Sequence, residues 1–155
     1  MRPYGPAALR LCVGAVFLVH GAQKLFGLLG GGGISGTAKM LASFGLPSPS
    51  VLAVVLGLVE FGGGVLLMLG TVTLWVALAL LVDVGLTVWK VHYPHGLTLK
   101  GGVLPGYGQA GELQFVLMGA LLCLLLGGPG AWSMDERRSQ HREAQARGRA
   151  RMRKV

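Results

Sequence analysis

Four long apolar segments dominate the sequence, at residues 7–29, 51–70, 74–91 and 112–128. A helix needs about 20 apolar residues to cross the hydrocarbon core of a bilayer, and each segment meets or approaches that length. Their residues do not alternate between polar and apolar as the strands of a membrane barrel do. Because helices are the other way to satisfy the backbone inside lipid, the pattern predicts an all-α membrane protein that folds as a four-helix bundle.

The connections between these segments differ in length. Residues 30–50 and 93–111 are rich in glycine and proline, so we expect two long irregular loops there. Residues 71–73 form a short link, which makes the second and third helices antiparallel neighbours. An even number of spans places both termini on one side, and Arg2, Arg10 and the arginine-rich end of the chain predict that this side is cytoplasmic.

The end of the chain differs in composition from the rest. The whole chain is 52% hydrophobic and 13% charged, whereas a soluble domain is usually about 25% charged. The net charge of +8 comes mainly from the cations after Asp135, which are Arg137, Arg138, Arg142, Arg147, Arg149, Arg151, Arg153 and Lys154. We therefore divide the chain into a membrane domain, residues 1–134, and a basic cytoplasmic tail, residues 135–155. This tail is expected to contact anionic lipid or a protein partner; nucleic acid is not expected, because no aromatic residue interleaves the cations.

Two carboxylates lie inside apolar segments, where a charge is costly. Glu60 lies near the middle of the second segment, and Asp83 lies at a similar position in the third. Charged side chains at bilayer depth normally face the protein interior or a wet cavity and have a partner. The sequence therefore predicts a polar centre inside the bundle, and this centre is the candidate functional site.

A polar layer follows from counting residues along each predicted helix. At about 1.5 Å per residue, His20, Glu60 and Asp83 lie at similar depths below the side of the long loops. Lys24 lies one turn nearer the loops on the same face as His20, so we expect it to pair with Glu60 or Glu112. The candidate residues of this layer are His20, Gln23, Lys24, Glu60, Asp83, His92 and Glu112, with Gln114 beside the last.

Three roles stay open for this layer on the residues alone. It could bind a polar headgroup such as the two carbonyl groups of a quinone, it could pass protons, or it could only hold the helices together. Small residues favour close helix packing on the same segment as Glu60. The predicted packing positions are Ala53, Gly57, Gly63 and Gly64.

Neither the cysteines nor the histidines predict a metal centre. Cys12 and Cys123 lie far apart in apolar segments without CxxC spacing, so we expect two buried residues rather than a disulfide or a zinc site. His92 and His95 lack the matched cysteine or carboxylate spacing of a metal site, and their aromatic neighbours suit the membrane interface. We expect no metal.

Five stretches carry a further signal when they are taken together. They are R-L-C-V-G-A-V-F-L-V-H-G-A-Q-K-L-F-G from Arg10, G-L-V-E-F-G-G-G-V-L-L-M-L-G from Gly57, V-H at Val91, G-E-L from Gly111 and G-P-G-A-W-S-M-D from Gly128. In this order they resemble the DoxX family of small bacterial four-helix membrane proteins, over most of residues 10–135. The resemblance implies a multi-pass protein of the bacterial cytoplasmic (inner) membrane.

The resemblance also implies a connection with membrane redox chemistry. Members are described as subunits of a thiosulfate:quinone oxidoreductase or as membrane partners of thiol-redox and oxidative-stress proteins. His20, Gln23, Lys24, Glu60, Gly63, His92 and Glu112 fall on polar and glycine positions that recur in the family. Asp83 and the basic tail fall outside that pattern, so any role they have is specific to this chain.

We therefore expect a quinone-linked membrane subunit that acts with a partner oxidoreductase. The chain has no CxxC pair, haem-ligand pair or flavin motif, so a partner is expected to supply the electron carrier. No intrinsic cofactor is expected, and quinone is the candidate ligand. The alternative is a non-catalytic accessory subunit that stabilises a larger membrane complex. A small transporter or proton path is a weaker third interpretation, because no internal repeat or broken helix is evident. No complete catalytic constellation is present in the sequence, so enzymatic activity stays open.

Overall fold

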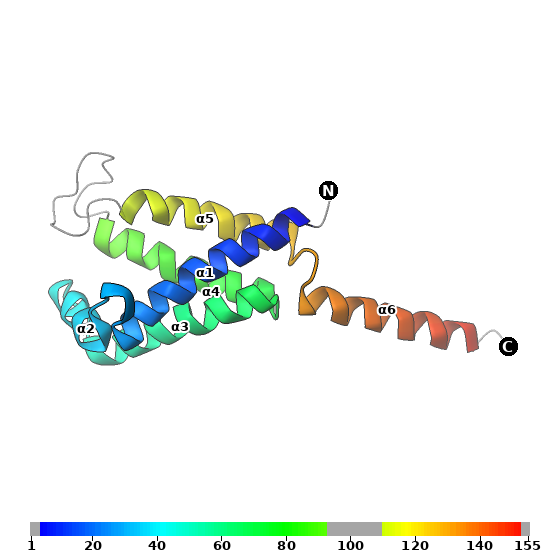
Figure 1. Cartoon of the computed structure of the whole chain (residues 1–155), viewed down its shortest axis with the longest axis horizontal. Helices are drawn as coiled ribbons and strands as arrows, with labels where there is room; N and C mark the ends of the chain where they lie inside the picture. Colours follow the sequence, from blue (N-terminus) through cyan, green and yellow to red (C-terminus); the bar gives the residue numbers. More distant parts are fainter. Residues whose placement is uncertain (1–3, 93–109, 153–155) are drawn as a thin grey trace.

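The computed structural model describes residues 4–92 and 110–152, and these fold into helices without any strand. Figure 1 shows a bundle of long helices lying side by side, with a short helix at one end and a further long helix beyond the other end. The long apolar helices are α1 (Tyr4–Phe26), α3 (Pro49–Leu69), α4 (Thr73–Thr87) and α5 (Ala110–Gly127). The short helix is α2 (Gly33–Ser43) and the polar one is α6 (Met134–Met152), with a 3₁₀ turn η1 (Leu28–Gly30) and a π-helical turn η2 (Val88–His92). The predicted all-α fold is confirmed.

Three of these helices are long and apolar enough to cross a membrane. They are α1, α3 and the continuous helix Thr73–Lys90, which joins α4 to the first turn of η2. The apolar run of α5, Leu113–Gly127, is shorter. The chain is therefore a multi-pass membrane protein with three to four apolar helices.

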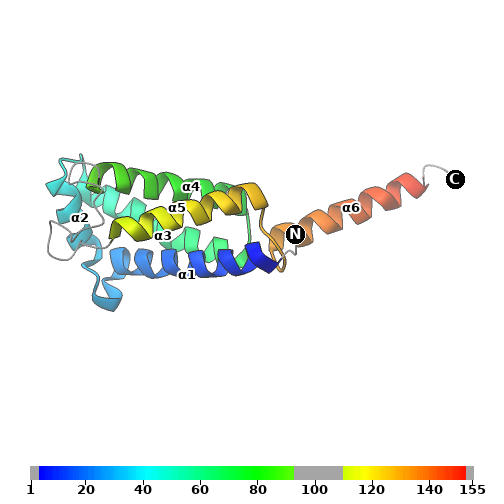
Figure 2. The ribbon, with the colours of Figure 1, turned by 90° about the horizontal axis from the view of Figure 1, so that it is seen from above.

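The bundle has two different ends. The start of α1 and the start of α6 lie at one end, which we call the terminal end, and α2 lies at the opposite end (Figures 1 and 2). Between them runs an apolar core contributed by α1, α3, α4 and α5. Its members are Val13, Phe17, Leu67, Val76, Ala77, Leu80, Val84, Leu117, Leu121 and Leu124.

Glycines bring α1 and α3 into close contact. A Cβ atom at Gly64 would lie 2.5 Å from the backbone nitrogen of Leu18 and 2.7 Å from the carbonyl oxygen of Gly14. A Cβ atom at Gly21 would overlap the backbone of Phe61. In lipid, where apolar burial does not drive helices together, such close van der Waals packing is a main source of association.

The predicted packing positions serve two different contacts. Ala53, Gly57 and Gly64 are buried. Gly57 packs on the Leu25 side chain of α1, where a Cβ atom would lie 2.7 Å away, whereas Gly63 faces Leu80 of α4 at 3.0 Å.

The sequence predicts an irregular loop for the first long connection, residues 30–50. This prediction is wrong, because the connection contains α2. Thr37 and Leu41 of this helix are buried, and Ile34 precedes them at helical spacing. The glycines of residues 30–33 and the prolines at 47 and 49 obscured this short periodic run. Residues 93–109, the second expected loop, lie outside the described residues.

Asp135 of α6 caps the N-terminus of α4, which lies 62 residues earlier in the chain, and so holds the terminal end together. Its carboxylate accepts hydrogen bonds from the backbone N–H groups of Val72 (2.9 Å) and Thr73 (2.8 Å) and from the Thr73 hydroxyl (2.9 Å). Its own N–H donates to the carbonyl of Gly70 at 3.0 Å. The first turn of α6 is thus fixed to the turn between α3 and α4.

Arg10 lies buried in the same place. It is 2% exposed, and its guanidinium lies against Gly70, where any Cβ atom would overlap it. Gly70 ends α3 in the left-handed region, with φ of +65°. The sequence analysis used Arg10 only as a sign of membrane orientation. In the structure its side chain fills the interior of the α3–α4 turn.

The outer surfaces carry two further features. Helix α6 extends away from the bundle (Figure 2), and its described arginines, Arg137, Arg138, Arg142, Arg147 and Arg149, are exposed. The expectation of buried cysteines is wrong, because Cys12 and Cys123 both face outward. On helices that cross a membrane, this outward surface is the one that contacts lipid, and a small apolar side chain is equally compatible with it.

We expect Gly64→Ala to destabilise the bundle by about 1–3 kcal/mol, because the added methyl group has no space between α1 and α3. Gly62→Ala is the matched control two residues away, since a Cβ atom there meets nothing within 4 Å. It should be neutral or slightly stabilising, because alanine favours helix interiors over glycine. Thermal unfolding of both purified variants in detergent checks this, and equal melting temperatures would contradict the close contact.

We expect Asp135→Ala to cost about 0.5–2 kcal/mol at neutral pH, through loss of the helix cap. Burial opposes ionisation, but the hydrogen bonds from Thr73 and Val72 outweigh it and lower the pKa of Asp135 below its ordinary value. A lowered folded-state pKa gives stability that is present above the unfolded-state pKa, about 3.9, and is lost as the pH falls through the folded-state pKa.

The difference in stability between wild type and Asp135→Ala should therefore be constant at neutral pH and shrink below about pH 4. Thermal unfolding followed across this range measures it. Glu136→Gln is the control, because Glu136 is exposed and its carboxylate accepts a hydrogen bond from Gln140 on the next turn of the same helix. A difference that persists unchanged in acid would show that the carboxylate does not supply the cap.

Candidate functional site

A cavity of about 300 Å³ lies in the half of the bundle nearest α2. Helices α1, α2, α3, α4 and α5 and the turn η2 all contribute side chains to it. The size falls at the lower limit of ordinary small-molecule pockets, which are roughly 300–1,000 Å³.

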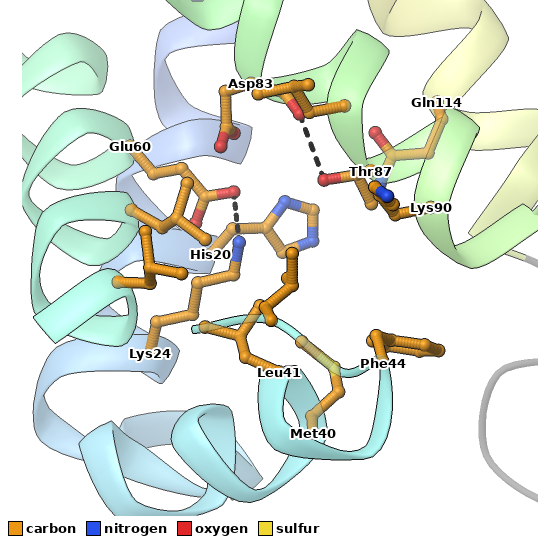
Figure 3. Close-up of a pocket in the computed structure, with 14 residues that line it drawn as sticks. His20, Lys24, Met40, Leu41, Phe44, Glu60, Asp83, Thr87, Lys90 and Gln114 are labelled. Carbon is orange, nitrogen blue, oxygen red and sulfur yellow. Dashed lines mark hydrogen bonds and ion pairs between the residues drawn. The ribbon is translucent and has the colours of Figure 1, made fainter. Parts of the chain in front are cut away.

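One part of the lining is apolar. It consists of Met40, Leu41, Phe44, Leu46, Leu52, Leu56 and Leu86. The first three come from α2 and the residue that follows it, so the helix that the sequence analysis missed forms a wall of the site (Figure 3). The spacing of Ile34, Thr37 and Leu41 could have revealed it.

An ion pair joins α1 to α3 at the polar part of the lining. The Lys24 ammonium donates to Glu60 Oε1 at 2.6 Å. The Glu60 side chain is 7% exposed and the Lys24 side chain 23%. Of the two partners that the sequence left open for Lys24, the structure places Glu60 against it.

Asp83 faces Glu60 from α4. It is 5% exposed, and Figure 3 shows its carboxyl group directed toward that of Glu60. Among the residues that the structure describes, Glu60 Oε2 and Asp83 Oδ1 are buried without a hydrogen-bond partner. The two carboxylates that the sequence singled out thus meet on one side of the cavity.

Further polar groups come from three other places. His20 of α1 is partly buried and lines the cavity together with Gln114 of α5. Thr87 and Lys90, which the sequence analysis did not include in the polar layer, also line it. Thr87 donates to the backbone carbonyl of Asp83 at 3.0 Å.

The π-helical turn explains why Lys90 was missed. Lys90 stands where α4 widens into η2, so a regular helix does not give its direction. Its ammonium also lies 4.3 Å from the centre of the Trp89 ring, which is exposed. Such turns are frequent at functional sites, and this signal is visible only in the structure.

Not every sequence candidate reaches the cavity. The Gln23 amide donates to the Leu29 carbonyl at 3.3 Å, outside the cavity lining. The side chains of His92 and Glu112 lie outside the described residues, as does His95.

An apolar groove runs along the outer surface of α3 and α4. It is lined by Leu56, Val59, Trp75, Leu78, Ala79, Val82, Asp83 and Leu86. Three of these residues, Leu56, Asp83 and Leu86, also line the cavity. The cavity and the lipid-facing surface are therefore separated by a wall only one layer of side chains thick.

The arrangement suits an amphiphilic molecule. Hydrogen-bond donors and carboxyl groups converge from α1, α3, α4 and α5, and apolar side chains fill the remaining lining. Within residues 4–92 and 110–152, no group of three histidine, cysteine, aspartate or glutamate side chains gathers as metal ligands would.

Comparison with known proteins identifies relatives over most of the chain. The uncharacterized membrane protein Rv3486 of Mycobacterium tuberculosis is 32% identical over 148 residues, covering 92% of this chain and 86% of the relative. The inner membrane protein YphA of Escherichia coli is 30% identical over 138 residues, covering 88% and 91%.

A further relative matches only in part. CatD of Bacillus subtilis, which is named as an oxidoreductase, is 38% identical over 69 residues, covering 44% of this chain and 46% of its own. No solved structure matches the chain. The model of the DoxX family matches residues 5–93, which cover α1 to α4, four of the helices that line the cavity. This chain is a membrane protein of the DoxX family.

Proposed function

We propose that this chain is a quinone-binding membrane subunit that works with a partner oxidoreductase. The observation that carries the proposal is the cavity, in which hydrogen-bonding groups of four helices meet beside an apolar wall. A quinone combines two polar carbonyl groups with an apolar ring and tail, so its chemistry matches both parts of the lining.

The polar groups provide suitable donors for quinone carbonyl oxygens. Lys24 uses one of its three ammonium donors on Glu60, and the others remain for a ligand. His20 and Gln114 line the same cavity from α1 and α5, and each carries a ring or amide N–H group. These three residues would hold the carbonyl groups, and Met40, Leu41 and Phe44 of the α2 wall would cover the ring.

The lipid-facing groove supports a ligand that arrives from the bilayer. It shares Leu56, Asp83 and Leu86 with the cavity, and it extends from Trp75 to Leu86, about 16 Å along α4 at 1.5 Å per residue. A hydrocarbon tail has its favourable environment along such an apolar surface. The headgroup would occupy the cavity and the tail would follow the groove.

A bound quinone would supply two-electron redox chemistry, with proton uptake on reduction. The residues of this chain bind and orient the headgroup, and α2 shields it from water. The electrons come from the partner, and the partial similarity to CatD, named as an oxidoreductase, agrees with a redox context.

The basic tail supports docking of the partner at the terminal end. Helix α6 contains six arginines against three carboxylates, and its described arginines are exposed. It is polar on all sides, so an apolar face for insertion into lipid is lacking. We infer that the terminal end is cytoplasmic, as the positive charge implies, and that α6 binds an acidic protein surface there.

An accessory role is the second candidate. The close contact of α1 with α3 and the exposed α6 would equally suit a subunit that stabilises a larger complex. In that case the polar layer would be structural, and the cavity would not bind quinone.

We expect His20→Phe and Gln114→Leu each to weaken quinone binding. Each substitution keeps much of the side-chain volume and removes one neutral hydrogen bond, worth about 0.5–1.5 kcal/mol, so the dissociation constant should rise about 2- to 10-fold. Titration calorimetry with a decyl-tailed benzoquinone, on the protein in lipid nanodiscs, measures this.

Gln140→Leu is the matched control for this titration, because it removes the same amide from exposed α6 and should leave binding unchanged. Absence of saturable binding to the wild-type protein would favour the accessory role. Equal affinity in all four proteins would place the quinone elsewhere.

We expect charge reversal on α6 to release the partner. The full chain is purified from native membranes in mild detergent, and the amount of partner that co-purifies is compared with wild type. For the triple variant Arg142→Glu, Arg147→Glu, Arg149→Glu this amount should fall at least about tenfold, because the variant reverses the charge at the interface. Quantitative mass spectrometry of the purified complexes measures recovery.

The same three arginines replaced by lysine are the control, because charge is kept. Equal recovery with the glutamate variant would remove α6 from the interface, and a recovered complex without any oxidoreductase would favour the accessory role.

The side of the membrane on which α6 lies is checked with Gln140→Cys, in a background without the native cysteines. Labelling by an impermeant reagent in intact cells would reverse the orientation.

A further inference from the structure

Glu60 and Asp83 form a pair of carboxyl groups inside the bundle. Their geometry implies a particular protonation state, whether or not quinone is bound. Each residue is 5% exposed, and the two come from different helices with their carboxyl groups directed toward one another (Figure 3). An ionised carboxylate only accepts hydrogen bonds. Two ionised carboxylates in this position would therefore repel each other, and neither could satisfy the other.

The unpartnered atoms are the ones that the pair itself would use. Lys24 bonds Glu60 Oε1, whereas Glu60 Oε2 and Asp83 Oδ1 have no hydrogen-bond partner among the described residues. A buried carboxylate oxygen without a partner is strongly unfavourable. A proton between the two groups would turn a repulsive contact into a hydrogen bond.

In the described part of the chain, the charges around the pair are too few to balance two negative groups. Helix α1 contributes His20 and Lys24, α2 contributes only apolar side chains, and α5 contributes the neutral Gln114. Lys90 of η2 is exposed, and its ammonium lies 4.3 Å from the centre of the exposed Trp89 ring. Among the described residues, Lys24 is thus the cation that contacts the pair, through Glu60, and it balances one negative charge.

We propose that Glu60 and Asp83 share one proton, which bridges them in the empty cavity and which turns to a carbonyl oxygen of the molecule bound there. The pair then has a charge of −1, which Lys24 compensates. The second half of this statement rests on the proposed quinone function, whereas the shared proton does not. Asp83 would then be a ligand-binding residue of the cavity.

The proton can be observed in the protein without quinone. We expect the infrared spectrum of the full chain in lipid, at neutral pH, to contain the C=O stretch of a protonated carboxyl group, and this band should shift on exchange into D₂O. Absence of such a band in the wild-type protein would overturn the proposal, and this outcome does not depend on any variant.

Two conservative variants show whether the proton is shared. With Asp83→Asn, Glu60 retains Lys24 and should ionise; with Glu60→Gln, Lys24 becomes available to Asp83, which should ionise in turn. Each single substitution should therefore abolish the whole band. A band that survives Glu60→Gln would show that Asp83 is neutral by itself and would overturn sharing.

Glu136→Gln is the matched control, since it makes the same chemical change on exposed α6 and should leave the band intact. The ligand half is tested by adding the decyl-tailed benzoquinone to the wild-type protein. We expect the carboxyl band to shift to higher frequency, because the O–H group then donates to a neutral carbonyl oxygen, which is a weaker acceptor than the ionised carboxylate. If calorimetry detects quinone binding and the carboxyl band does not change, the proposed hydrogen bond to the ligand is overturned. If the band is present and quinone does not bind, the quinone function is overturned and the shared proton is unaffected.

Discussion

The close approach of α1 and α3 is the constraint on which the rest of the structure depends. Gly14, Gly21 and Gly64 let the two backbones meet where any side chain would intrude. The same approach brings Lys24 within 2.6 Å of Glu60, so a steric feature of the sequence also creates the buried ion pair. A buried pair adds little net stability against an apolar replacement, because desolvation offsets attraction. The glycines therefore account for the packing, and the ion pair accounts for the polarity of the cavity.

The two ends of the bundle differ in what lies beside their buried polar groups. At the terminal end, Asp135 fills the hydrogen-bonding needs of the α4 N-terminus, and Arg10 and Ser133 are fully buried around Gly70. That end is closed by protein. At the α2 end, carboxylate oxygens of Glu60 and Asp83 stay without protein partners, and a cavity lies beside them. Buried polar atoms normally have partners. The unpartnered carboxylate oxygens have a cavity beside them in which a ligand or a proton fits, whereas the unpartnered Nε and Nη1 atoms of Arg10 lie inside the α3–α4 turn.

The sequence predicts the helices well because their signals are local, and it predicts contacts only where spacing constrains them. Apolar length predicted the apolar helices, three of which are long enough to cross a membrane, and equal depth from the loop side brought Glu60, Asp83 and His20 to one cavity. Helix α2 was missed because its glycine-rich start resembles a loop. Lys90 was missed because a π-helical turn redirects it. The bond from Asp135 to Thr73 spans 62 residues, and no periodicity carries information over that distance.

Asp83 shows how one side chain can change the charge balance inside a bundle without changing its fold. The ion pair of Lys24 with Glu60 already balances its own charge, and a bundle with an apolar residue at position 83 would contain a neutral centre. Adding a carboxyl group at that point, 5% exposed and against Glu60, introduces an acid that must either lose its charge or find a cation. The described surroundings supply no second buried cation to it. Since Asp83 also lines the groove on the lipid side, the proton it requires lies between the cavity and the bilayer, where a lipid-soluble carbonyl compound would arrive.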